Sequence, residues 1–284
     1  PISKKFFVKL ANIPKNSFQV YLFITFVTAI ANLVSWSLGL VAGAVLAIQM
    51  AKVMKEKGIK IHYPLLVASA YAGFVIWELG LTSSIALSIA TPEHPFEAVI
   101  GIIPTSETIF SAWNITVALI VAFTLPVVMA LLRPKNDDEI VEMENVSEVA
   151  ATIEVGAVEE TAARRSPAAF LENFIGLNWI LGLIGLYLFF NLIGDGLSVN
   201  TINLFFLTLT ILLTKSPMQL VRLINDGART MGPFILQYPI YAGIMGVLAA
   251  TGLGDVLAES LIGISTENTL PLFTFLSAGL LNIF

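Results

Sequence analysis

What the sequence lacks already excludes several classes of protein. The chain of 284 residues has no cysteine, which rules out disulfides, thiolate metal sites and cysteine nucleophiles. Two histidines are too few to favour a histidine-ligated metal centre. Only 12% of the residues are charged, against about 25% in a soluble domain, and the formal net charge of −5 offers no basic surface for nucleic acid. With 56% hydrophobic residues, the chain is predicted to be an integral membrane protein whose main partner is the lipid bilayer.

Seven apolar runs dominate the chain. None of them alternates as a membrane β-strand does, so each is predicted to be helical and the fold class all-α. Two flanking segments, 3–15 and 217–229, are predicted to be interfacial amphipathic helices. The acid-rich residues 133–173 lack a core-forming pattern and are predicted to be a cytoplasmic linker. The apolar runs are residues 18–50, 64–90, 116–132, 177–193, 201–213, 231–251 and 271–284.

The first run is too long for one crossing. As a single helix its 33 residues would measure about 50 Å, whereas the hydrocarbon core is about 30 Å thick. Half of it, at about 24 Å, is short of a comfortable crossing. Polar residues lie in its middle, and lysines flank both ends, which places both ends in the cytoplasm. Residues 18–51 are therefore predicted to form a re-entrant helical hairpin.

The cytoplasmic ends of the hairpin determine on which side of the membrane each later loop lies. All 15 Lys and Arg residues then fall inside, and the loop 91–115, which holds three glutamates and no Lys or Arg, falls outside. Five crossings separate the hairpin from the last run, which therefore enters from the opposite face. Residues 278–284 can be aligned with residues 28–34, so that Asn282 corresponds to Asn32. We therefore predict an inverted repeat, with residues 1–132 in the first half, the linker 133–173, and residues 174–284 in the second half.

Two polar clusters interrupt the apolar runs and are the candidate site. Gly and hydroxyl residues permit a membrane helix to unwind, and the freed backbone groups can bind ions or small anions. Helix packing is the alternative, because Gly, Ser and Thr are also common between membrane helices. The candidate residues are Asn32, Ser35 and Ser37 in the hairpin, Thr82, Ser83 and Ser84 in the second run, and Asn282 in the last.

Glu78 is the only ionisable residue inside any apolar run. Intramembrane carboxylates are functional by default, but no run contains a Lys or Arg to pair with it. Glu78 is therefore expected to be a neutral acid, a cation-bound carboxylate or a group that faces a wet cavity. Asn32, Ser37, Glu78 and Thr82 are the candidate ligands of a coupling ion.

No enzyme signature accompanies these clusters. The sequence has no Gly-x-Ser-x-Gly elbow, no paired intramembrane aspartates and no histidine cluster. An intramembrane hydrolase would thus lack a nucleophile and its base. A channel stays open as an alternative, but hairpins that enter from opposite faces favour a carrier.

Several stretches resemble the bacterial short-chain fatty acid transporters (acetoacetate/butyrate type) of the ion transporter superfamily. They follow the family order over nearly the whole chain. The stretches are Ser35–Ala44, Tyr63–Leu66, Ala90–Pro92, Ile103-Pro104, Thr108–Asn114, Asn200–Leu204 and Tyr238–Ile244. The chain departs from the family pattern at one place. Members of the family commonly have Gly or His and further glycines after the tryptophan that corresponds to Trp77, whereas this chain has Glu78-Leu79 there. The resemblance therefore does not support a family role for Glu78.

The resemblance implies a secondary transporter, a homodimer in the bacterial inner membrane, and a longer protein with further N- and C-terminal parts. The function expected is cation-coupled uptake of a short-chain carboxylate such as acetoacetate or butyrate by alternating access. A dicarboxylate or another organic anion as substrate, or a passive anion channel, are the alternatives. No cofactor is expected beyond Na⁺ or H⁺ as the coupling ion, and Na⁺ is slightly favoured.

Overall fold

The structure, a computed structural model, describes residues 2–143, 167–253, 256, 259–260 and 263–281. Every regular element in these ranges is an α-helix or a 3-10 helix. This confirms the predicted all-α membrane class. The segments long and apolar enough to cross a membrane are Ser17–Val34, Trp36–Glu56, Tyr63–Ile89, Ala112–Leu131 and Ile175–Leu192.

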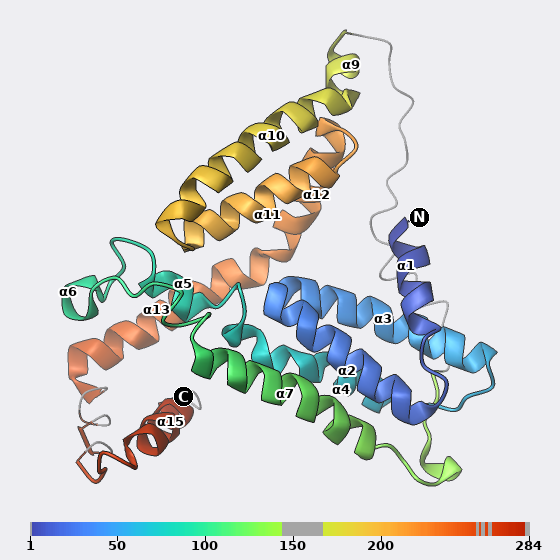
Figure 1. The fold of residues 1–284 in the computed structure, drawn as a ribbon, viewed down its shortest axis with the longest axis horizontal. Coiled ribbons are helices and arrows are strands. Elements are labelled where there is room, and N and C mark those ends of the chain that lie inside the picture. Colours follow the sequence, from blue (N-terminus) through green and yellow to red (C-terminus); the bar gives the residue numbers. More distant parts are fainter. Residues whose placement is uncertain (1, 144–166, 254–255, 257–258, 261–262, 282–284) are drawn as a thin grey trace. The chain divides into compact units, whose positions relative to one another are not determined.

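The first apolar run is divided into two helices that pack against each other. Helix α2 (Ser17–Val34) ends and helix α3 (Trp36–Glu56) begins on either side of Ser35 (Figure 1). The two helices pack along each other, and Lys57 Nζ, at the end of α3, donates a hydrogen bond of 3.0 Å to the carbonyl of Asn12 in the segment that precedes α2. A helical hairpin is therefore present.

The lengths of the two hairpin helices differ from the expectation. At roughly 1.5 Å per residue, α2 and α3 measure about 27 Å and about 32 Å, because they contain 18 and 21 residues. Helix α3 continues through Lys52 and Lys55, beyond the apolar run. Contrary to the expectation for each half, both helices are long and apolar enough to cross a membrane. Re-entry of the hairpin stays a prediction.

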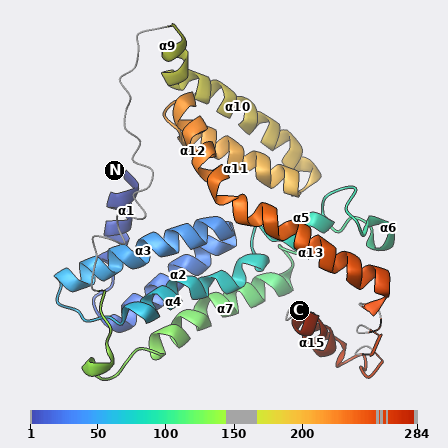
Figure 2. The ribbon, with the colours of Figure 1, turned by 180° about the vertical axis from the view of Figure 1, so that it is seen from behind.

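Helices that follow the hairpin in the sequence pack beside it. The next run forms helix α4 (Tyr63–Ala72), the 3-10 helix η1 (Gly73–Leu79) and helix α5 (Ser84–Ile89), followed by α6 (Glu97–Ile100) and α7 (Ala112–Leu131). Helices α4 and α7 lie beside α2 in both views (Figures 1 and 2). The apolar core between α2, α3 and α4 includes Tyr21, Ile24, Leu46, Met50, Met54 and Leu66, all fully buried.

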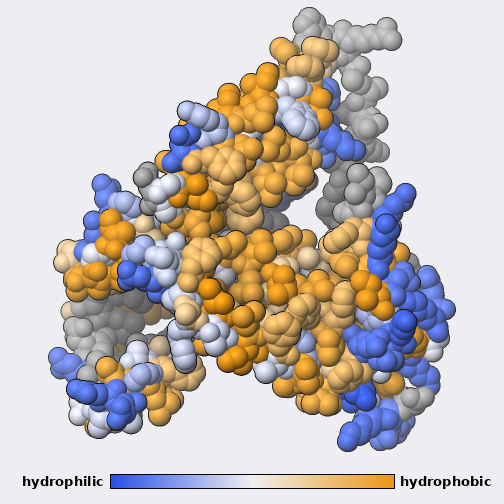
Figure 3. Space-filling model, viewed as in Figure 1, coloured by the Kyte–Doolittle hydropathy of each residue, from blue (hydrophilic) through white to orange (hydrophobic). Residues whose placement is uncertain are grey.

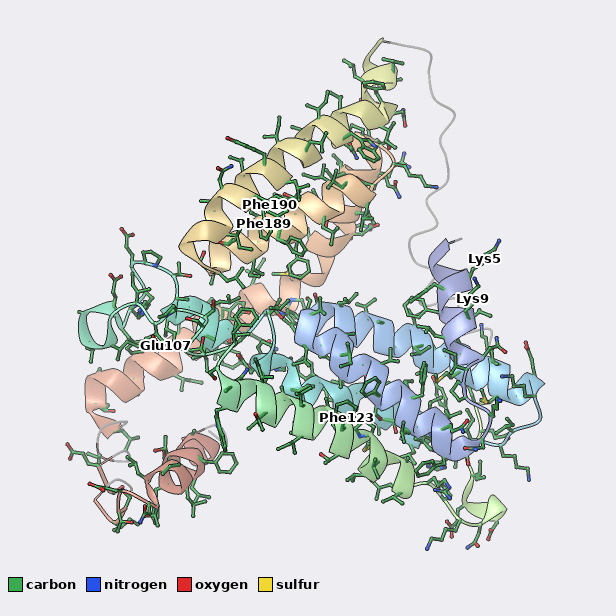
Figure 4. All side chains as sticks on the ribbon, in the orientation of Figure 1. Lys5, Lys9, Glu107, Phe123, Phe189 and Phe190 are labelled. Carbon is green, nitrogen blue, oxygen red and sulfur yellow. The ribbon has the colours of Figure 1, made fainter. Side chains whose placement is uncertain are left out.

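Charge is distributed unevenly along this part of the molecule. Lys5 and Lys9 project from helix α1 (Ile2–Ala11) at one end, and Glu107 lies in the loop at the other end (Figure 4). Phe123 of α7 lies between these ends and packs its ring 5.6 Å from that of Phe26. The surface between the ends is largely hydrophobic (Figure 3). A cytoplasmic location of the α1 end stays a prediction.

The acid-rich linker begins with a docked segment that the sequence does not predict. Tyr63 donates its backbone N–H to the carbonyl of Val141 over 2.8 Å, and Val141 donates its own to His62 Nδ1 over 3.1 Å. Met143 is buried in the core of the α2–α4 part. Residues 144–166 of the predicted linker lie outside the described residues.

The second half of the first unit is a further helix pair. The chain divides into two compact units, residues 1–220 and 221–284. In the first unit, α9 (Pro167–Asn173) leads into α10 (Ile175–Leu192), which packs on α11 (Val199–Leu213). Phe189 lies in this contact, 5.1 Å from the ring of Phe205, whereas Phe190 is exposed (Figure 4).

The last part of the chain is helical as well. Helix α12 (Pro217–Thr230) spans the division between the units, and the second unit contains α13 (Gly232–Thr251) and α15 (Leu270–Leu281). Helices α13 and α15 occupy the sixth and seventh apolar runs. Asn282 and the expected second hairpin tip lie outside the described residues, so the inverted repeat stays a prediction.

Candidate functional site

The tip of the hairpin is a single extended residue. Ser35 has φ −159° and ψ 131°, and its N–H still donates to the carbonyl of Ala31 over 2.9 Å. Its hydroxyl lies 3.1 Å from that of Ser37. Ser35 is buried and Ser37 is exposed. The helix therefore stops and restarts within one residue, which leaves the first N–H groups of α3 without intrahelical partners.

Asn32 lies just before this tip and is fully buried. Its Nδ2 donates to the carbonyl of Thr28 over 2.8 Å, within the same helix. Its Oδ1 is buried without a hydrogen-bond partner. The amide faces Gly39, where a Cβ atom would lie 2.2 Å from Asn32 Oδ1. The glycine thus makes room for an amide whose acceptor has no hydrogen-bond partner.

The second run is broken where the polar cluster was predicted. Glu78, near the end of η1, accepts from the hydroxyl of Ser83 over 2.8 Å and from the N–H of Ser84 over 3.0 Å. The Ser84 hydroxyl donates to the second carboxylate oxygen. Ser83 is buried, and its hydroxyl also accepts the N–H of Ala86, so Ser83 is the N-cap of α5. Three donors thus hold this carboxylate against the start of α5.

The broken run and the hairpin tip are in direct contact. Leu81 donates its N–H to the carbonyl of Leu33 over 2.8 Å, and Trp36 donates its N–H to Thr82 Oγ1 over 3.2 Å. Gly80 permits this approach, because a Cβ there would lie 2.3 Å from the carbonyl oxygen of Leu33. Polar groups from two apolar runs thus meet at one place, with Thr82 against the first turn of α3.

The candidate residues do not all take part equally. Thr82 contacts the hairpin directly, whereas Ser83 and Ser84 bond to Glu78. Asn32 and Ser35 are buried beside the tip. Asn282 lies outside the described residues. Among the described residues, no group of three or more His, Asp or Glu side chains could hold a metal ion.

Asn114 belongs to this region as well, although the sequence pattern does not indicate it as a candidate. It lies in the first turn of α7, where its N–H donates to the capping hydroxyl of Ser111 over 3.2 Å. Its side-chain Nδ2 donates to the carbonyl of Leu79 over 2.9 Å and to that of Ile109 over 2.8 Å. The spacing in the sequence gave no signal, because Leu79 is 35 residues away.

Comparison with known proteins identifies the family. A family model described as "Short chain fatty acid transporter" matches residues 1–284. The chain belongs to the short-chain fatty acid transporter family. This confirms the resemblance and, with the apolar helices, makes the chain part of a multi-pass membrane protein.

Two relatives of this family member carry names that refer to short-chain fatty acid transport. One, from Escherichia coli, is 32% identical over 275 residues, which cover 96% of this chain and 61% of the relative. The other, from Haemophilus influenzae, is 31% identical over 295 residues, which cover 99% of this chain and 64% of the relative. The chain thus spans about three fifths of the length of these curated relatives. No solved structure matches it.

Proposed function

We propose that the protein to which this chain belongs is a secondary active transporter that takes up a short-chain carboxylate, such as acetoacetate or butyrate. Membership of the family supports this substrate class. The contact between the hairpin tip and the broken run supports a binding site at that place, since interrupted membrane helices present unpaired backbone groups to substrates. Alternating access and a homodimeric assembly are part of the same proposal.

The observation that carries the proposed mechanism is the unpartnered Oδ1 of Asn32. A buried acceptor without a partner costs about 1–3 kcal/mol, and a bound cation would compensate for this cost. Carbonyl and hydroxyl oxygens are ligands that hard cations such as Na⁺ prefer. Asn32 Oδ1 would supply such an oxygen, and the hydroxyls of Ser37 and Thr82 are further candidate ligands, although that of Thr82 already accepts from Trp36. These residue types fit Na⁺.

Charge balance also favours coupling to a cation. The described residues of the hairpin tip and the break contain no Lys or Arg, and the charged side chain among them is Glu78. A substrate carboxylate would therefore meet neutral donors and the N-terminus of α3, equivalent to roughly half a positive charge. It would also meet the negative charge of Glu78. In a medium of low dielectric constant such an anion stays undercompensated unless a cation binds with it.

Na⁺ is a better candidate than a proton on Glu78. The carboxylate of Glu78 accepts from Ser83 and Ser84, including one backbone N–H. These bonds tie Glu78 to the N-terminus of α5, which it joins to the end of η1. We therefore assign Glu78 to holding the break and contributing negative charge near the cation, and we assign the coupling role to Na⁺.

Transport assays of the full-length protein in proteoliposomes test the proposal. Labelled butyrate uptake is measured with Na⁺ and pH varied separately. We expect a lower half-saturating substrate concentration as Na⁺ rises, and the reciprocal effect of substrate on Na⁺ binding. Uptake at equal affinity without Na⁺ at pH 6 and pH 8 would contradict both cation versions.

Two further arms separate the alternatives. Competition by dicarboxylates and other organic anions tests the substrate class, because a dicarboxylate carrier would be inhibited by them more strongly than by butyrate. Counterflow of labelled butyrate against an unlabelled gradient distinguishes a carrier from a passive channel. A channel would show no counterflow.

Re-entry of the hairpin belongs to the proposal too. Ser37 is exposed at the tip, and the chain has no cysteine. A Ser37→Cys variant is treated from outside with a membrane-impermeant thiol reagent, with cysteines at Lys9 and at Glu107 as references for the two sides. A re-entrant tip would be protected from outside, whereas labelling at the Glu107→Cys rate would show that α2 and α3 cross the membrane fully.

A further inference from the structure

The break in the second run takes the helical partner away from the carbonyl of Leu79. In a continuous α-helix the carbonyl of Leu79 would accept the N–H of Ser83. Here the N–H of Ser83 donates instead to the carbonyl of Gly80 over 3.1 Å. Each unsatisfied backbone group at membrane depth is costly, because no water is there to replace the lost bond. The conformation of the break therefore depends on a donor from elsewhere.

Asn114 supplies that donor from α7. Its Nδ2 reaches the Leu79 carbonyl over 2.9 Å and, with its second hydrogen, the Ile109 carbonyl over 2.8 Å. The Ser111 cap fixes the turn of α7 from which the amide projects. Two hydrogens on one nitrogen thus join the end of η1 to the loop that precedes α7.

The residues that follow Leu79 are the ones that touch the hairpin. Leu81 bonds to the Leu33 carbonyl, and Thr82 accepts from the first N–H of α3. Asn114 therefore anchors the chain at Leu79, two and three residues before the contacts of Leu81 and Thr82 with the hairpin. A shift of the Leu79 carbonyl would move Thr82 relative to the tip.

The second bond of the Asn114 amide connects the site to the loop 91–115 through Ile109. Ile109 is buried in a small apolar cluster with Ala86 and Leu87 of α5. Helix α5 follows the break, and Ile109 precedes α7. The two bonds of Asn114 thus link segments on both sides of the break through one side chain.

We propose that Asn114 is a positioning residue for transport, because its amide holds the broken run at Leu79 so that Thr82 stays against the hairpin tip. This inference rests on the proposed function for the identity of the site. Asn114 itself is assigned no contact with substrate or ion. Its effect passes through the backbone of residues 79–82.

The test replaces Asn114 in the full-length protein. Asn114→Leu keeps the size of the side chain and removes both donors. We expect the half-saturating concentrations of Na⁺ and of butyrate to rise about tenfold, with the maximal rate per folded molecule reduced less. Asn114→Gln, which keeps the amide, is expected to restore part of the affinity. Thr116→Ala is the matched control on α7, since its exposed hydroxyl bonds only within its own helix.

The results distinguish the positioning role from a purely structural one. Unchanged half-saturating concentrations in Asn114→Leu, or an equal rise in Thr116→Ala, would overturn the inference. If Asn114→Leu does not reach the membrane, Asn114→Asp takes its place, because it keeps the shape without the two donors. Failure of Asn114→Asp to fold while Asn114→Gln folds would also overturn it, since the amide would then serve folding.

Failure of the proposed function would look different. Uptake by the wild-type protein that does not respond to Na⁺ would refute Na⁺ coupling. The half-saturating concentration of butyrate in Asn114→Leu would still test the positioning role in that case.

Discussion

The α2–α3 pair and the α10–α11 pair each bury an asparagine, and the two amides differ in their contacts. Asn178 of α10 is 1% exposed, and its Nδ2 lies 2.6 Å from the hydroxyl of Thr214 at the end of α11. Asn32 of α2 is 0% exposed, and its Nδ2 bonds within its own helix to Thr28. The Oδ1 of Asn32 has no partner.

This difference separates packing from binding. The bond of Asn178 joins two helices, so the stability of the pair explains why the polar side chain is there; such interhelical bonds contribute about 0.6–2 kcal/mol in membranes. Asn32 joins no second helix through its amide and leaves an acceptor unpaired, which costs stability. We therefore expect Asn32 to serve ligand binding and Asn178 to serve folding.

The largest effect is expected for Asn32→Ala. Removal of the amide takes away the proposed cation ligand, so Na⁺-dependent uptake of butyrate should fall on the order of 100-fold, equivalent to about 3 kcal/mol. Surface expression and thermal stability should be retained or improved, because a buried unpaired acceptor is removed. Uptake by purified protein in proteoliposomes and a melting curve in detergent measure the two effects.

Asn191→Ala is the control for this prediction. Asn191 is exposed and its amide bonds only to the carbonyl of Tyr187 in the same helix. It should behave as wild type. Transport by Asn32→Ala at the wild-type rate would mean that Asn32 is a packing residue like Asn178. The two asparagines would then not differ in role.

Gly39→Ala should have the next largest effect. The added Cβ would lie 2.2 Å from Asn32 Oδ1, so either α3 or the amide must move. Overpacking of this kind costs about 1–3 kcal/mol, and we expect about a tenfold lower Na⁺ affinity. Gly182→Ala is the matched variant in the other pair, because its Cβ would meet the flexible end of Leu212. Equal loss of Na⁺ affinity in both variants would show that the effect is not local to Asn32.

Asn178→Ala should reverse the pattern of Asn32→Ala. The loss of the bond to Thr214 is expected to lower the free energy of unfolding by about 1–2 kcal/mol. Transport per folded molecule and its Na⁺ dependence should stay near wild type. Chemical denaturation in detergent and uptake normalised to folded protein measure these quantities. A change in Na⁺ affinity without loss of stability would move Asn178 from the packing class to the binding class.

The positions of the breaks could be predicted because their causes are local. Gly and polar residues within an apolar run weaken a membrane helix at that place, and the structure breaks at Ser35 and at residues 80–83. Helix bounds followed the apolar runs in the same way, as for α7, expected at 116–132 and found at Ala112–Leu131. The end of α3 was missed, because lysines at a helix end do not stop the helix.

The contacts that organise the site could not be predicted, because their partners are distant in the sequence. Nothing near Asn114 indicates that its amide reaches Leu79, and nothing near Val141 indicates the bond to His62, 79 residues away. The unpartnered state of Asn32 is equally invisible, since it depends on what α3 and α4 place around it. A sequence pattern shows which residues are polar, and only the packing shows which of them are already satisfied.

The smallest effect is expected for Thr82→Val. Valine keeps the shape of threonine but cannot accept the N–H of Trp36, so the bond of 3.2 Å between the break and the hairpin is lost. One neutral hydrogen bond contributes about 1 kcal/mol, which corresponds to about a fivefold higher half-saturating Na⁺ concentration. Thr124→Val is the control, because the exposed hydroxyl of Thr124 bonds within α7 to Ile120. If Thr82 is also a direct Na⁺ ligand, its loss should approach that of Asn32→Ala, and the double variant should be little worse than either single one. If Thr82 only joins the two segments, the effects should add. A Thr82→Val protein with unchanged Na⁺ dependence would exclude both roles, and Asn32 would then have to bind its ligand without help from the broken run.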